Sequence, residues 1–280
     1  MKKMTFAVLF AVFGAVLAFG QEFSDFEFRT NGSGDGVIVT GYRGSAPELS
    51  VPATIDGLPV IEIANNAFAR NLDIVSVRIP QSVTRMGSGV FAGCRNLVRV
   101  EVPVSVREFE DAAFKDCENL LEFEFPPFVE SVPREMFSGC VSLGQVRLNP
   151  GLTRIGESAF AGTRALTAIE FPEGLTHIDG GAFGQSGLTD LFLPASVVAI
   201  AYQAFASSNI RTVHFPNNNR LTVGESAFAQ CGSLTSVIIP ETVSTVDFEA
   251  RNRNYVPFYL VSLNSASQAA LRKVGYRWDF

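Results

Sequence analysis

Cysteine is the residue type in this chain with the greatest capacity for chemistry, and there are four. Each follows a recurring phenylalanine by three positions; they are Cys94, Cys117, Cys140 and Cys231. The chain has no CxxC motif, and thiols stacked in a row cannot surround an ion tetrahedrally, so a metal site is not indicated. Stacked coils lie about 5 Å apart, so a Cys94–Cys117 disulfide stays open as an alternative. We interpret the four as buried free thiols, because free cysteine packs as a small hydrophobe.

The histidines and serines do not form a recognisable catalytic arrangement. His177 and His214 lie in different units and outside any HExxH spacing, so a zinc enzyme is not indicated. Ser158 and Ser226 occur in GESAF segments, which lack the terminal glycine of a nucleophile elbow. The glycine-rich segment 31–36 lacks the lysine of a phosphate-binding loop and is predicted to be a turn. We therefore expect neither a metal nor a cofactor.

A row of glutamates gives the one enzymatic hypothesis. Glu101 and Glu124 are expected to be neighbours on adjacent strands, about 5 Å apart, which is the carboxylate separation of retaining glycosidases. Arg99 and Arg147 flank them, and no aromatic platform for a sugar lies beside them. We interpret the row as a solvated ladder of mixed charge and predict that the protein is not an enzyme.

A repeat that runs through most of the chain positions these residues. Phenylalanine recurs 23 residues apart five times, then after 22 and after 23, at Phe68, Phe91, Phe114, Phe137, Phe160, Phe183, Phe205 and Phe228. Prolines keep step with these phenylalanines, from Pro80 to Pro240. A fixed period in this range predicts a solenoid, in which each unit buries its apolar face against its neighbours.

Each unit has a pattern typical of a short strand. In one unit, Phe123 and Phe125 precede Pro126, and their spacing places both side chains on the same face of a strand. Proline ends the strand because it cannot donate to the ladder. The Ala-Phe element, as at Ala113-Phe114, is predicted to close the coil as one helical turn whose phenylalanine joins an interior stack.

Units such as 106–126, with the sequence VREFEDAAFKDCENLLEFEFP, resemble the short leucine-rich repeat of the BspA-like family of bacterial surface and exported proteins. Residues 37–68 resemble that family's entry segment, and residues 261–280 resemble its closing segment. The resemblance implies an α/β fold: a right-handed, curved leucine-rich-repeat solenoid of about eight 23-residue units with a parallel sheet along one face. It also implies a non-enzymatic protein–protein interaction module, since family members are mostly linked to adhesion.

The ends of the chain give the domain boundaries. We expect a signal peptide at 1–20, an N-terminal cap at 21–59, leucine-rich repeats at 60–248 and a C-terminal cap at 249–280. Segments 26–30 and 37–42 flank the glycine-rich loop and are predicted to form a β-hairpin. In the C-terminal cap, Ser265 or Ser267 is predicted to begin a short helix that ends near Gly275.

The first 20 residues predict export. Lys2 and Lys3 precede an uncharged run at 4–19 that ends in Ala18-Phe19-Gly20, which is typical of a secretory signal cut after Gly20. A transmembrane anchor is the alternative, but 16 residues fall short of the ~20 that span a bilayer. Without the two lysines, 20 basic and 28 acidic residues leave a net charge of −8, which argues against nucleic acid or an anionic membrane as a partner. We expect a periplasmic, extracellular or cell-surface protein.

The outward strand positions give a candidate binding site. They are charged in the first units and then become apolar, with Phe192, His214 and Ile238 expected side by side and Ala168 and Thr212 nearby. A histidine here would make binding sensitive to pH, because imidazole gains charge on mild acidification. The alternative is that the C-terminal segment, with Tyr255, Phe258 and Tyr259, covers these residues.

The expected partner is a protein of a host or of the cell envelope, bound in an adhesion-type contact through the concave sheet face. The alternative function is a periplasmic carrier or scaffold that binds a small apolar ligand or another envelope protein. In either case we expect no nucleic acid and no membrane insertion of the mature chain.

Overall fold

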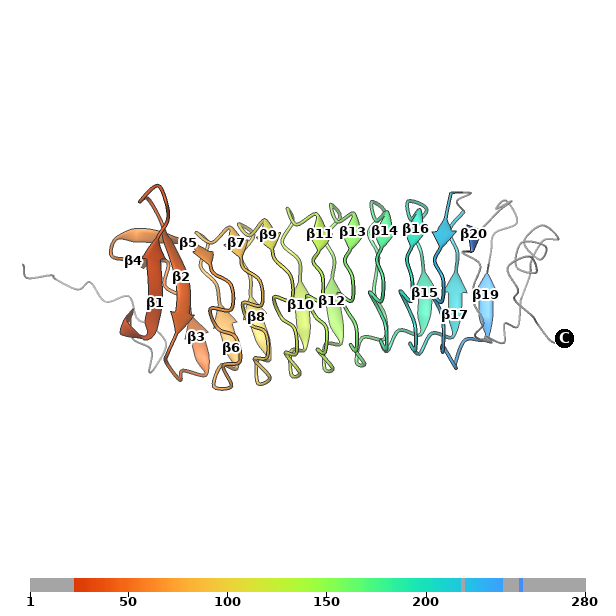
Figure 1. Ribbon diagram of the computed structural model, residues 1–280, viewed down its shortest axis with the longest axis horizontal. Helices are drawn as coiled ribbons and strands as arrows, with labels where there is room; N and C mark the ends of the chain where they lie inside the picture. The colour runs from red at the N-terminus through yellow and green to blue at the C-terminus, as the bar shows by residue number, and fades with distance from the viewer. Residues whose placement is uncertain (1–22, 218–219, 239–246, 249–280) are drawn as a thin grey trace, which may run out of the picture.

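The computed structural model describes residues 23–217, 220–238 and 247–248. Over these residues the chain winds into one elongated solenoid of short strands, most of them parallel, with successive coils stacked along its length (Figure 1). The predicted leader at 1–20 and the predicted C-terminal cap at 249–280 lie outside the described residues. The coils carry two rows of strands on different sides of the solenoid, whereas the sequence predicted a sheet on one face only.

The strands fall into three groups. At the N-terminus the elements are η1 (Phe23–Asp25), β1 (Phe26–Thr30), β2 (Val37–Tyr42), β4 (Thr54–Ile55) and β5 (Leu58–Ile63). The three-residue row consists of β3 (Glu48–Ser50), β6 (Ser76–Arg78), β8 (Arg99–Glu101), β10 (Glu122–Glu124), β12 (Gln145–Arg147), β15 (Asp190–Phe192), β17 (Thr212–His214) and β19 (Ser236–Ile238). The two-residue row consists of β7 (Arg85–Met86), β9 (Glu108–Phe109), β11 (Ser131–Val132), β13 (Arg154–Ile155), β14 (His177–Ile178), β16 (Ala199–Ile200), β18 (Thr222–Val223) and β20 (Asp247–Phe248).

The N-terminal strands continue one of these rows. β1 pairs antiparallel with β2, and β2 pairs parallel with β5, which is followed in the same sheet by β7 and β9. The turn between β1 and β2 is held by Asn31, whose side-chain oxygen accepts the backbone N–H groups of Asp35 and Gly36, each at 3.1 Å.

The phenylalanine stack predicted from the repeat is present. Consecutive rings from Phe68 to Phe228 are nearly parallel, inclined by 3° to 16°, with centroids 5.0 to 5.7 Å apart. All eight are buried. Each ring from Phe91 to Phe205 therefore packs against the rings of both neighbouring coils, which holds the register between coils because aromatic pairs add about 0.5–1.5 kcal/mol beyond their burial.

The α/β label and the helical turn predicted for the Ala-Phe element are both wrong. Among the described residues the only helix is the three-residue 3₁₀ segment Phe23–Asp25. The phenylalanine N–H bonds to the next coil instead of to its own turn, as Phe91 does to the Ala113 carbonyl at 2.8 Å. Backbone groups used between coils are not available for a helix.

Left-handed residues are the second reason that no helix forms. Two residues before each stacked phenylalanine the backbone has positive φ, at Asn66, Gly89, Ala112, Glu135, Ser158, Gly181, Gln203 and Ser226. Two residues after it φ is positive again, at Arg70, Gly93, Asp116, Gly139, Gly162, Gln185, Ser207 and Gln230. A left-handed residue interrupts an α-helix, so each turn bends sharply on both sides of its phenylalanine.

Both strand rows are interrupted between β8–β9 and β10–β11, and the three-residue row is interrupted a second time between β12 and β15. In the two-residue row the cause is Pro133, which stands where Glu110 and Gly156 donate their N–H to the preceding coil. In the three-residue row, bulky Phe123 stands where the adjacent strands have Val100 and Val146. The step from Phe114 to Phe137, 5.7 Å, is also the longest in the stack. We call the boundary between β8–β9 and β10–β11 the joint.

Candidate binding surface

The three-residue row presents an outward face on which every second side chain points to solvent. In β15, Leu191 is buried while Asp190 and Phe192 on either side of it are exposed. In β10, Phe123 is likewise buried between exposed Glu122 and Glu124. This alternation is the one predicted from the sequence, and it makes the outward positions the natural candidates for contact with a partner.

The first part of this face is a network of ion pairs. Arg78 pairs with Glu101 at 2.9 Å, and Arg147 pairs with Glu124 at 3.5 Å. The predicted pairing of the Glu101 and Glu124 strands does not form, because β8 and β10 lie on opposite sides of the joint. Each carboxylate is paired with an arginine, so the geometry adds no support to the glycosidase hypothesis.

The last described part of the face is apolar and aromatic. Phe192, His214 and Ile238 are in register across β15, β17 and β19, as the sequence predicted. The Phe192 and His214 rings are stacked, with centroids 4.1 Å apart and planes inclined by 15°. Phe192 is 62% exposed, while His214 and Ile238 are half-buried. We call these three residues the apolar patch.

The other two candidate residues lie beside the patch in different ways. Thr212 is in β17, in register with Asp190 and Ser236, so it continues the row behind the patch. Ala168 is exposed but belongs to a segment that forms no strand, between β12 and β15. The structure therefore brings Thr212 to the patch and leaves Ala168 in the coil that precedes β15, outside the strand register of the patch. Tyr255, Phe258 and Tyr259, which were expected as an alternative cover, lie outside the described residues.

The four cysteines are free and buried, which confirms the interpretation of their spacing. Each thiol donates to the carbonyl of the stacked phenylalanine in the preceding coil; Cys94 reaches the Phe68 carbonyl at 3.0 Å. Burial raises the pKa of the Cys94 thiol to about 11 and the pKa of Cys117 well above its ordinary range. Within the described ranges, no group of three or more histidine, cysteine or acidic side chains is placed to hold a metal.

The candidate catalytic residues His177, Ser158 and Ser226 occupy strand and turn positions of the coils. His177 lies in β14 in the two-residue row, and its Nδ1 is 2.8 Å from the Thr176 hydroxyl. Ser158 and Ser226 occupy left-handed turn positions two residues before a stacked phenylalanine. Their places in the turn account for their recurrence in the GESAF segments.

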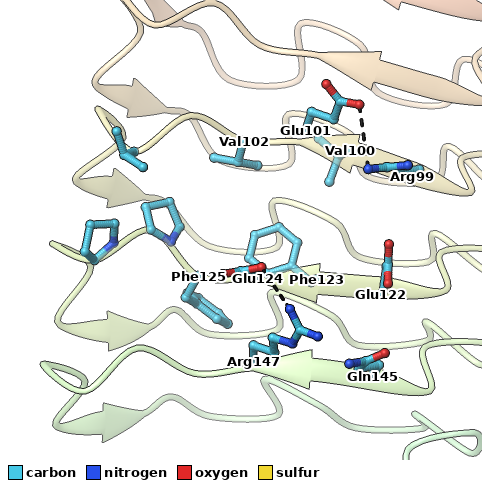
Figure 2. Close-up of a pocket in the computed structure, with 13 residues that line it drawn as sticks. Arg99, Val100, Glu101, Val102, Glu122, Phe123, Glu124, Phe125, Gln145 and Arg147 are labelled. Atoms are coloured by element: carbon cyan, nitrogen blue, oxygen red, sulfur yellow. Dashed lines mark hydrogen bonds and ion pairs between the residues drawn. The ribbon is translucent and has the colours of Figure 1, made fainter.

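A groove at the joint was not predicted. It has a volume of about 440 Å³ and lies between β8 and β10, with charged walls from Arg99, Glu101 and Glu122 (Figure 2). Val100 and Val102, which the repeat directs inward, are half-buried here because the strands separate. The replacement of a small residue by Phe123 and the presence of Pro133 are the sequence signals that could have indicated it.

The sequence matches the family model of the BspA type leucine rich repeat region, in six copies, over residues 61–186 and 130–254. The chain belongs to this family. Repeat solenoids of this kind generally serve as protein-interaction modules, because the stacked coils present an extended surface. Within the described part of the chain, no helix has the length and apolar character that a membrane crossing requires.

A solved structure shares the fold, and others are similar in sequence. The leucine-rich repeat protein TpLRR of T. pallidum is 24% identical, with 93% of this chain and 98% of that chain covered and a TM-score of 0.51. A leucine-rich repeat protein from Bacteroides ovatus is 20% identical over 84% of this chain and 77% of its own, with a TM-score of 0.47. A leucine rich cell surface protein from Faecalibacterium prausnitzii is 23% identical over 83% and 86%, with a TM-score of 0.44. No curated protein matches the sequence.

Proposed function

We propose that this protein is an exported, non-enzymatic module that binds a protein of a host or of the cell envelope through the apolar patch, in an adhesion-type contact. The observation that carries the proposal is Phe192, a phenylalanine that is 62% exposed and stacked on His214. A large aromatic side chain held rigidly at the surface loses little conformational entropy when a partner covers it, which favours it as an anchor.

The position of the patch supports a protein partner over a small apolar ligand. Phe192, His214 and Ile238 lie on the open outward face of adjacent strands, with Asp190 and Thr212 in register behind them. An apolar centre beside polar residues is the usual composition of a protein–protein contact. A surface of this kind buries one face of a partner but does not enclose a small molecule.

The test compares Phe192→Ala and Ile238→Ser with Glu124→Ala, which changes the charged part of the same face. Binding partners are isolated from host or envelope extracts with the intact protein and then measured against each variant. We expect Phe192→Ala to weaken binding by about 30-fold, from a cost of about 2 kcal/mol, while the melting temperature falls by only a few degrees through loss of the stack on His214. A lower melting temperature with unchanged binding would show that the patch only stabilises the fold.

Export is tested separately. Mass spectrometry of protein from the native host is expected to give a mature chain that begins at Gln21. Protease treatment of intact cells then distinguishes the locations, since a surface protein is cleaved while a periplasmic protein is protected. A periplasmic location would favour the carrier or scaffold function over adhesion.

A further inference from the structure

The joint leaves backbone groups of the three-residue row without their usual partners. Ile79 donates its N–H to the Glu101 carbonyl at 3.0 Å, and Phe125 donates to the Arg147 carbonyl at 3.0 Å. The equivalent amide in the coil of β8 is that of Val102, and its N–H donates to no backbone carbonyl of the next coil. The Leu121 N–H still donates to the Val98 carbonyl at 3.2 Å, so the two coils are bonded at the start of β8 and β10 and separate toward Val102. The separation leaves the Val102 N–H without a backbone acceptor in the next coil and leaves the side chains of Val100 and Val102 half-buried.

The groove that results has a different character at its two ends. At one end its walls are polar, with Arg99, Glu122 and Gln145 drawn at the right of Figure 2. At the other end it is lined by Val104 and by Pro126-Pro127. Its volume of about 440 Å³ lies within the ~300–1,000 Å³ range of ligand sites. An occupant must therefore be polar at one end and apolar at the other.

The charges of the groove favour a cationic group at its polar end. Glu101 is paired with Arg78 and Arg99, and Glu124 is paired with Arg147. Glu122 makes no ion pair within the described part of the chain, and it faces Gln145 in register on β12. The five charged lining residues, two arginines and three glutamates, sum to −1. Glu122 is thus the carboxylate left to pair with a ligand.

We propose that this groove binds an extended segment of a partner protein that carries a lysine or arginine. The basic side chain lies against Glu122, with its aliphatic part over Val100, and an apolar side chain two residues away lies over Val102, on the side toward Val104. The spacing follows because side chains two apart in an extended chain lie on the same face, about 7 Å apart. A carbonyl group of the segment accepts the Val102 N–H, which donates to no backbone group of the next coil, as in peptides that bind to an open strand edge.

An oligosaccharide fits the same groove less well. Sugar recognition uses an exposed aromatic face for stacking, but Phe123 and Phe125 are each only 4% exposed and pack against other phenylalanines. The proposed segment site is separate from the apolar patch and does not rest on it. Loss of one contact is therefore distinguishable from loss of the other.

The test is an NMR titration of the full chain with the capped peptide Ac-Ser-Lys-Ser-Val-Ser-NH₂. We expect saturable shifts at the Val100, Val102 and Val104 methyl groups, and binding that weakens as salt rises because the contact is ionic. A peptide with norleucine in place of lysine is expected to bind at least threefold more weakly, which corresponds to one exposed ion pair. Absence of saturable shifts at these valines up to 10 mM peptide, or equal affinity of the two peptides, would overturn the proposal.

Variants locate the contact. Glu122→Gln is expected to weaken the lysine peptide about threefold without changing the melting temperature, since Glu122 is exposed and makes no internal pair. Gln145→Glu adds a second carboxylate opposite Glu122 and is expected to strengthen binding about twofold. Glu173→Gln, an exposed glutamate outside the groove, is the matched control and is expected to have no effect. Phe192→Ala should also leave peptide binding intact; equal losses in Glu122→Gln and Glu173→Gln would refute the site.

Discussion

The rings of Phe192 and His214 stack across β15 and β17, with centroids 4.1 Å apart and planes inclined by 15°. The backbone ladder already places the two residues in register, so the stack fixes the Phe192 rotamer at the surface. An exposed phenylalanine held in one orientation differs from one that is free to move, because its ordering entropy has been lost before a partner arrives.

The stack should be measurable as a coupling between the two side chains. We expect a double-mutant cycle of Phe192→Ala and His214→Ala, followed by urea unfolding, to give a coupling free energy of about 0.5–1.5 kcal/mol. The same cycle of Phe192→Ala with Ser233→Ala, an exposed residue in another coil, should give none. If the two cycles agree within error, the stack is not a stabilising contact in solution.

The sequence was sufficient to predict the stacked core and the outward face. A fixed spacing of phenylalanines has one simple geometric solution, in which each ring lies over the ring of the preceding coil. The alternation within each strand then placed Phe192 outward and Leu191 inward, as the structure has them. The apolar patch could be predicted because it depends only on these two periodicities.

The turns and the joint could not be predicted in the same way. Left-handed positions carry Gly93 and Gly162 but also Arg70, Ala112 and Glu135, so residue type alone does not reveal them. Their conformation is imposed by hydrogen bonds between coils rather than by local propensity. The joint could not be predicted from the repeat period, because a regular period implies an uninterrupted ladder of strands. The missing donor at Pro133 and the large side chain of Phe123 interrupt that ladder.

At the left-handed turn positions, a change to glycine and a change from glycine should have opposite effects on the free energy of unfolding. Ala112 has φ of 57°, so Ala112→Gly should stabilise the protein by about 0.5–1 kcal/mol, the strain relieved less the entropy that glycine adds to the unfolded chain. Gly93→Ala should destabilise it by more than about 1 kcal/mol, since φ is 74° and the new Cβ would lie 3.2 Å from the Arg70 Cγ. Gly232→Ala, where nothing lies within 4 Å, is the control for urea unfolding. Destabilisation by Ala112→Gly would contradict the assigned conformation.

Hydrogen exchange should show the joint directly. The Val102 amide makes no bond to the next coil, whereas the equivalent amides of Ile79 and Phe125 donate at 3.0 Å. We expect Val102 to exchange at least tenfold faster than both under native conditions, because exchange reports the local opening free energy. Equal protection at the three positions would show that the ladder is closed in solution.

The buried thiols predict a loss of stability in alkali. Burial raises the pKa of Cys94 from its ordinary value of 9.0 to about 11 in the folded protein. Below about pH 9 the thiol holds its proton in both states and the folded protein keeps its full stability. Between about pH 9 and 11 the unfolded state loses the proton while the folded state retains it, so the free energy of unfolding falls by about 1.4 kcal/mol per pH unit for this group.

The Cys94→Ala variant isolates that contribution from other alkaline effects. At pH 8 the variant should be less stable than the native protein, because the thiol packs in the core and donates to the Phe68 carbonyl at 3.0 Å. Only the native protein loses the Cys94 contribution, so the difference in free energy of unfolding between the native protein and Cys94→Ala should shrink by about 2 kcal/mol between pH 8 and 11.

Thr163→Ala is the matched control, because Thr163 is buried at the same position of its unit and does not ionise in this range. Since both proteins then keep Cys94, the difference in free energy of unfolding between the native protein and Thr163→Ala should stay constant. A constant difference for Cys94→Ala as well would mean that the folded thiol ionises as readily as the unfolded one, and that the cysteine stack is open to solvent.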